Sequence, residues 1–159
     1  MRRYLLPGLC VLVLVLGLHT LTIASGVPSD LPLETVDILT ATGERHSFKA
    51  HLAATPETRA RGLMYVTRLE ADHGMLFDFE SPRIVHMWMK HTPLSLDMLF
   101  IDAGGRIARI EAHTKPFSTR LIASGSEARA VLELNAGTAE RLGITAGDRV
   151  VHRLFDQDR

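Results

Sequence analysis

The sequence predicts an all-β domain, a sandwich or a barrel of about eight short strands with two short helices, behind an N-terminal signal peptide. Three observations predict it. From residue 33 onward, short apolar runs alternate with turn signals. Helical patterns are confined to two short stretches. The first 26 residues differ from the rest, because they contain Arg2 and Arg3, no acidic residue and a long apolar run.

The N-terminal segment has the order of a secretory signal: basic residues, then the apolar run Leu5–Leu18, then small residues that end at Gly26. This order predicts a signal peptide over residues 1–26, cleaved after Ala24 or Gly26, and a periplasmic or secreted protein. The alternative is an uncleaved anchor, because residues 5–24 are about as long as a bilayer requires.

The remainder is predicted to be one domain. Residues 27–32 hold two prolines and read as a linker, and the domain covers residues 33–159. The turn signals 41–44 and 102–105 separate predicted strands. The expected strands are 33–39, 48–52, 74–79, 84–90, 96–101, 106–111, 128–134 and 148–155.

Two short helices fit between these strands. The first begins where Thr55 can cap and Pro56 suits the first helical position. The second covers residues 138–142, with Gly143 as its left-handed stop. The longest stretch expected to lack regular structure is 113–127, and a loop of that length is often functional.

Composition excludes several classes of function. Without Arg2 and Arg3 the chain has 16 basic and 18 acidic residues, so it lacks the positive charge typical of a nucleic-acid-binding protein. Cys10 is the only cysteine and lies in the signal segment, so the domain has no disulfide and no thiolate nucleophile. No Gly-x-Ser-x-Gly or His-Glu-x-x-His motif occurs, and no cofactor is expected.

Six segments, taken in order, resemble one family. They are 59–64 (Arg-Ala-Arg-Gly-Leu-Met), 74–77 (Gly-Met-Leu-Phe), 88–92 (Trp-Met-Lys-His-Thr), 96–101 (Leu-Asp-Met-Leu-Phe-Ile), 132–137 (Leu-Glu-Leu-Asn-Ala-Gly) and 147–148 (Gly-Asp). In this order they resemble the Domain of Unknown Function 192 family across nearly the whole predicted domain. The family pattern has Asn where this chain has His91. The resemblance implies a compact β-rich fold, often exported, and it brings no activity, substrate or catalytic residue.

Three charges are embedded in apolar sequence: Lys90, Asp97 and Glu133. A buried charge is costly unless it is paired, so such groups collect either at functional sites or in ion-pair networks that hold strands in register. With Trp88 beside Lys90, the functional interpretation is a site for a small polar ligand. The structural interpretation is a buried polar network.

The segment 86–91 suggests a second site. In a strand, Met87, Met89 and His91 would share one face, and thioethers with an imidazole suit cuprous ion. Methionine also fills irregular cores, which is the structural interpretation of the same pattern.

The function predicted from these features is an exported binding or accessory module for a small polar ligand or a cell-envelope partner. Contact with the membrane is expected only if the N-terminal segment stays uncleaved. The first alternative is a periplasmic enzyme with hydrolase-like acid–base chemistry at Lys90, Asp97 and Glu133. The second is a copper-handling protein that uses Met87 and Met89 with His91. No residue is assigned a catalytic role.

Overall fold

The computed structural model describes residues 26–27 and 30–155. The expected signal peptide lies outside these residues except for Gly26. In the described part, no helix has the length and apolar character needed to cross a bilayer. The elements in chain order are β1 (Leu33–Leu39), β2 (Arg45–Ala53), α1 (Pro56–Arg61), β3 (His73–Met87), β4 (Leu96–Ile101), β5 (Ile107–Glu111), β6 (Ile122–Asn135), α2 (Thr138–Arg141), β7 (Arg149–Val151) and the 3-10 helix η1 (Arg153–Phe155).

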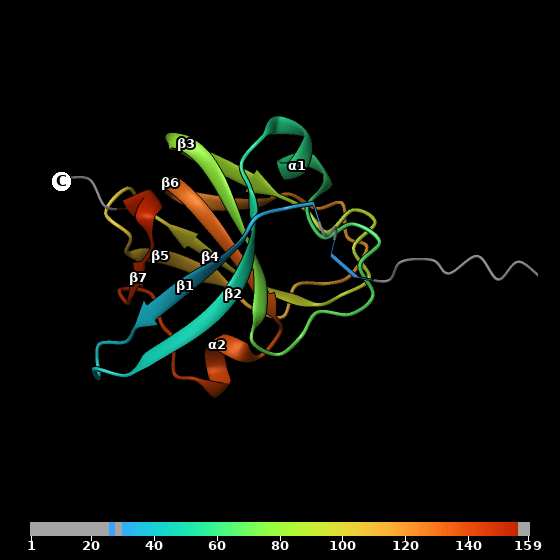
Figure 1. The fold of residues 1–159 in the computed structure, drawn as a ribbon. Helices are drawn as coiled ribbons and strands as arrows, with labels where there is room; N and C mark the ends of the chain where they lie inside the picture. The colour runs from blue at the N-terminus through green and yellow to red at the C-terminus, as the bar shows by residue number, and fades with distance from the viewer. Residues whose placement is uncertain (1–25, 28–29, 156–159) are drawn as a thin grey trace, which may run out of the picture.

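The strands form one sheet in the order β5-β4-β6-β3-β2-β1-β7, in which only the β2–β3 pair is parallel. The sheet curls into a half-barrel (Figure 1), and its two edges meet at one end. There the Val150 amide donates to the Gly105 carbonyl at 2.7 Å, and the Ile107 amide donates to the Asp148 carbonyl at 2.9 Å. The predicted class, mostly β with two short helices and a barrel-like sheet, is confirmed.

Two apolar clusters lie on opposite faces of the sheet. The inner core fills the half-barrel and takes side chains from every strand. The outer core lies on the other face of β3, β4 and β6, beneath Leu63, Val66 and Met89. Successive residues of a strand point to opposite faces, so Leu132 and Leu134 lie in the inner core while Val131 lies in the outer core.

Several strand boundaries differ from the predicted ones. Segments 74–79 and 84–90 are not two strands but one long strand, β3, which ends at Met87. An irregularity between Asp78 and Arg83, which includes Pro82, interrupts the pairing of β3 with β6, and the pairing resumes from Arg83 onward. The predicted loop 113–127 is shorter, because β6 already begins at Ile122. Strands 33–39 and 96–101 were predicted with the bounds of β1 and β4.

Both helices form where their capping signals predict. The Thr55 hydroxyl accepts from the Thr58 amide at 3.2 Å, and the Thr58 hydroxyl accepts from the Thr55 amide at 3.0 Å, which is a reciprocal capping box. After α2, Gly143 has a φ of 65° and the Ile144 amide donates back to the Ala139 carbonyl at 2.9 Å. This closure buries Ile144 against the inner core.

The meeting of the sheet edges generates the first prediction. Gly105 has a φ of 79°, and a Cβ there would lie 2.7 Å from the Val150 carbonyl oxygen, one strand away. We expect Gly105→Ala to lower the free energy of unfolding by more than about 2 kcal/mol. The cost of an alanine in the left-handed conformation adds to the cost of displacing the contact between Gly105 and Val150 at the sheet edges. The neighbouring Gly104→Ala is the control and is expected to change it by less than about 0.5 kcal/mol, because the nearest atom is the Asp102 side chain at 3.5 Å. Urea denaturation measures the free energy of unfolding of both variants, and equal effects would contradict a close contact between the two edges of the sheet at Gly105.

Candidate functional site

A pocket of about 240 Å³ opens over the outer face of the sheet. One wall is α1 with the turn behind it, which contributes residues 59–64. The other wall is β3 with the turn that follows it. Glu133 on the central strand β6 also lines the pocket. The side chains from β3 and its turn are Phe77, Phe79, His86, Met87, Trp88 and Thr92.

Glu133 is the unusual residue of this pocket. It is paired in register with Met75 and Met98, both fully buried, and it is itself 3% exposed. No described residue forms a hydrogen bond or ion pair with its carboxyl group. Burial raises the pKa of Glu133 to about 8. The group is therefore mostly protonated at neutral pH and presents an O–H donor at the outer face of the sheet.

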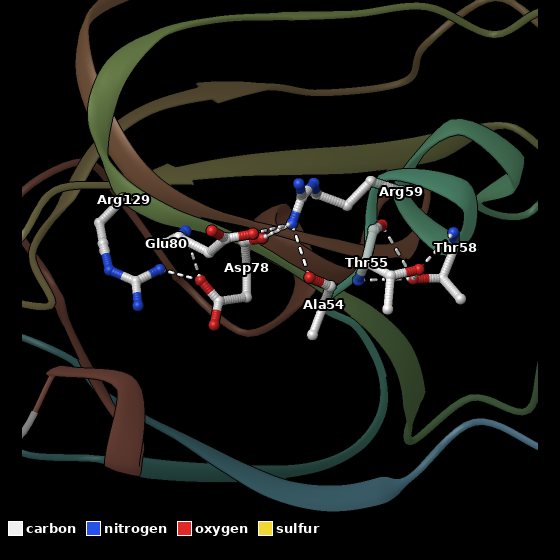
Figure 2. Close-up of polar contacts among 7 residues, drawn as sticks. All are labelled: Ala54, Thr55, Thr58, Arg59, Asp78, Glu80 and Arg129. Atoms are coloured by element: carbon white, nitrogen blue, oxygen red, sulfur yellow. Dashed lines mark hydrogen bonds and ion pairs between the residues drawn. The ribbon is translucent and has the colours of Figure 1, made fainter.

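Arg59 fastens the α1 wall to the sheet. As Figure 2 shows, its guanidinium reaches from α1 toward β2 and β3. Nη1 donates to the carbonyls of Ala54 and Asp78, each at 2.7 Å, and lies 3.1 Å from a Glu80 carboxylate oxygen. Its charge also lies over the Phe79 ring, 5.7 Å from the centroid. These contacts place α1, and therefore one wall of the pocket, against the bend of β3, which is the irregularity between Asp78 and Arg83.

Asp78 holds that bend. Its carboxylate forms an ion pair with Arg129 of β6 and accepts from the Glu80 amide at 2.6 Å (Figure 2). Burial alone would raise the pKa of Asp78, but the hydrogen bonds from Arg129 and from the Glu80 amide hold it below the ordinary value. The charged carboxylate therefore stabilises β3 where its pairing with β6 is interrupted.

A backbone contact joins the two turns that line the pocket. The Tyr65 amide donates to the His91 carbonyl at 2.8 Å, and the two rings stack with centroids 5.2 Å apart. Both residues have left-handed backbones, with φ of 64° for Tyr65 and 56° for His91. Asn adopts this conformation more readily than most residues, so the Asn that the resemblance implies at position 91 would fit this backbone.

The four proposed ligand-binding residues do not all lie together. Glu133 and Trp88 line the same pocket, and the Lys90 ammonium lies 5.3 Å from the centroid of the Trp88 ring. Asp97 lies elsewhere. It is paired with Leu134, whose side chain is in the inner core, so it points to the opposite face of the sheet from Glu133.

Asp97 is fully buried and satisfied by backbone amides. Its carboxylate accepts from the amides of His113 at 3.0 Å, Gly137 at 3.2 Å and Ala139 at 3.0 Å. These bonds join β4 to the β5–β6 loop and to the first turn of α2. The arrangement supports the structural interpretation of Asp97 and does not bring it together with Lys90 and Glu133 for acid–base chemistry.

The three residues of the predicted copper site are also separated in the structure. Met87 and Met89 are both buried in the outer core, whereas His91 is exposed on the turn, where it stacks on Tyr65. The expected alternation fails because β3 ends at Met87. Within residues 26–27 and 30–155, no group of three or more His, Cys, Asp or Glu side chains is placed to hold a metal ion.

Sequence reasoning missed most of the pocket walls. Arg59, Phe77, Phe79 and Thr92 line the pocket, yet none of them was a candidate. The signal that could have found Arg59, Phe77 and Thr92 is the resemblance itself, because four of its six segments (59–64, 74–77, 88–92 and 132–137) contribute residues to this pocket. Phe79 lies outside these segments.

The left-handed turn yields a prediction for His91. Replacing it with Asn should change the free energy of unfolding by less than about 1 kcal/mol, because the lower backbone strain of Asn at this φ offsets the lost stacking on the Tyr65 ring. Replacing it with Val should lower that free energy by about 1–2 kcal/mol, since a β-branched residue is strained at this φ. Urea denaturation at one pH compares the two variants, and Val tolerated as well as Asn would contradict the strain argument.

The buried acid makes stability depend on pH. Between pH 4.5 and about 8 the folded protein keeps a proton on Glu133 that the unfolded chain has lost, so the free energy of unfolding falls as pH rises through this window. The slope from this group approaches about 1.4 kcal/mol per pH unit. We expect Glu133→Gln, which does not titrate, to remove that slope. Its stability relative to the wild type should therefore rise between pH 5 and pH 8 in urea denaturation, and parallel profiles would refute the buried acid.

Two solved structures are similar to this chain over most of its length. One is a proposed transcription regulator from Sinorhizobium meliloti 1021, 46% identical with a TM-score of 0.76, and the match covers 79% of this chain and 97% of that one. The other is a protein of unknown function from Novosphingobium aromaticivorans DSM 12444, 34% identical with a TM-score of 0.76, covering 80% of this chain and 91% of that one.

No curated protein matches the sequence. The sequence pattern of the DUF192 family, described as "Uncharacterized ACR", matches residues 38–152. This span runs from β1 to the residue before η1 and includes every segment that lines the pocket over Glu133. The chain belongs to the DUF192 family.

Proposed function

We propose that this domain is a binding module for a small ligand and that the pocket over Glu133 is its site. The observation that carries the proposal is the buried carboxyl group that lines the pocket with no hydrogen-bonding or charged partner among the described residues. An unpartnered buried polar group costs about 1–3 kcal/mol, so a protein keeps one where it has a use.

The walls suit such a ligand. Leu63, Phe77 and Met87 provide apolar surface, while Thr92 and Glu133 provide a few polar groups, which is the usual make-up of a small-molecule site. The pocket volume of about 240 Å³ is smaller than that of pockets for drug-sized molecules, which is about 300–1,000 Å³, so the ligand is small. The basic and apolar N-terminal segment favours a periplasmic or secreted location for this binding.

The proposal predicts opposite effects of one substitution on stability and on binding. Glu133→Leu at pH 8 should raise the free energy of unfolding by about 1–3 kcal/mol, because an apolar side chain replaces a desolvated and unpaired acid. The same variant should no longer bind the fragments that a ligand-observed NMR screen identifies as ligands of the wild type. Glu127→Gln, an exposed change on the same strand, is the control and should alter neither property.

Amide shift changes in the wild type should cluster at residues 59–64, Phe77, Trp88 and Glu133. A screen without hits at these positions would reject a binding site here. A Glu133→Leu variant that is strongly destabilised would instead assign the carboxyl a structural role.

A further inference from the structure

The rim of the pocket over Glu133 is rich in positive charge. Arg59 and Arg61 line the pocket directly. The Arg83 guanidinium lies 5.1 Å from the centroid of Phe79, and the Lys90 ammonium lies 5.3 Å from that of Trp88. Both of these rings line the pocket, so the cations border it.

Only one of these cations is neutralised nearby. Arg59 is ion-paired with Glu80 and also donates to two carbonyls. Within the described residues, no carboxylate lies within ion-pair distance of Arg61, Arg83 or Lys90. The rim therefore has an excess of positive charge, and Arg61, an exposed residue in the last turn of α1, has a guanidinium fork available for an anion.

The chemistry at Glu133 differs from that at the rim. Burial raises the pKa of its carboxyl group, and among the described residues no rim cation forms an ion pair with it. The charged or titratable groups that line or border the pocket around it are Arg59 and Arg61 on α1, Arg83 and His86 on β3, and Lys90 on the turn. The flanking β4 presents Met98. A protonated carboxyl group here donates one hydrogen bond to a neutral acceptor of a ligand.

We propose that the ligand is a small organic anion with an acidic group at one end, an apolar body, and a neutral hydrogen-bond acceptor at the other end. The acidic group binds Arg61 at the rim, and the acceptor accepts a hydrogen bond from the Glu133 O–H. This inference rests on the proposed function and adds the class of ligand. The apolar body lies against Phe77, Met87 and Trp88. An ammonium ligand is disfavoured because it would have to pass the unpaired cations of the rim.

Three probes of the same shape test the class: 4-acetamidobenzoate, the neutral 4-acetamidobenzamide and the cationic 4-acetamidobenzylamine. Each carries an amide carbonyl as the acceptor for Glu133, and only the end group differs. Titrations followed by amide chemical shifts at pH 6.5 should give a Kd for the benzoate at least tenfold lower than for the other two. Arg61→Gln should abolish this preference. Arg141→Gln, at the last turn of α2, is the matched control and should preserve it.

The acceptor contact has its own readout. Loss of the Glu133 proton should weaken benzoate binding to the wild type by up to tenfold per pH unit above pH 8. Glu133→Gln retains an N–H donor, so its Kd should stay within about threefold between pH 7 and pH 9. A pH profile shared by both proteins would overturn the acceptor contact.

The outcomes separate the two proposals. If the neutral or cationic probe binds as tightly as the benzoate, with shift changes at Trp88 and Glu133, the anion class is wrong and the binding site stands. If the benzoate binds with shift changes elsewhere on the domain, the rim is not its site and the inference fails. If neither these probes nor the fragment screen perturbs the pocket, both proposals fail.

Discussion

The structure depends on the register of β6, the strand between β3 and β4 in the middle of the sheet. Its alternation sends Leu132 and Leu134 into the inner core and Val131 and Glu133 to the outer face. A slip of one residue would exchange the two sets and bury the carboxyl group inside the half-barrel. Because such a slip would place the Glu133 carboxyl group among the apolar side chains of the inner core, the register is strongly specified.

The pocket is held open by polar contacts that bind its walls to the sheet and to each other. Arg59 ties α1 to the bend of β3, and the Tyr65–His91 contact joins the turns that border the two walls. Left-handed backbones at Tyr65 and His91 persist because these surrounding contacts over-determine them. Strain, an unpaired acid and unpaired cations therefore gather in one region, whereas the inner core is regular and apolar.

Asp97 and Glu133 show why similar sequence settings lead to different roles. Both carboxyl groups are flanked by apolar residues in the sequence, and both are buried on adjacent strands. They point to opposite faces of the sheet. Asp97 meets three backbone amides of a loop and of α2, while Glu133 meets an apolar floor and a pocket. The same local pattern thus yields a structural anchor in one case and a candidate ligand contact in the other.

By itself, the sequence determined the β-rich class, the bounds of β1 and β4, both short helices and the choice of Glu133 and Trp88 as site candidates. These features depend on local signals: apolar runs between turn residues, capping residues and charges embedded in apolar sequence. The single long β3 and the early start of β6 were not predictable, because Pro82 and Gly125 weaken the local strand pattern and only cross-strand pairing carries each strand past them. The pocket walls and the separation of Asp97 from Glu133 were decided only by the tertiary structure, since both depend on which face of a curled sheet each side chain occupies.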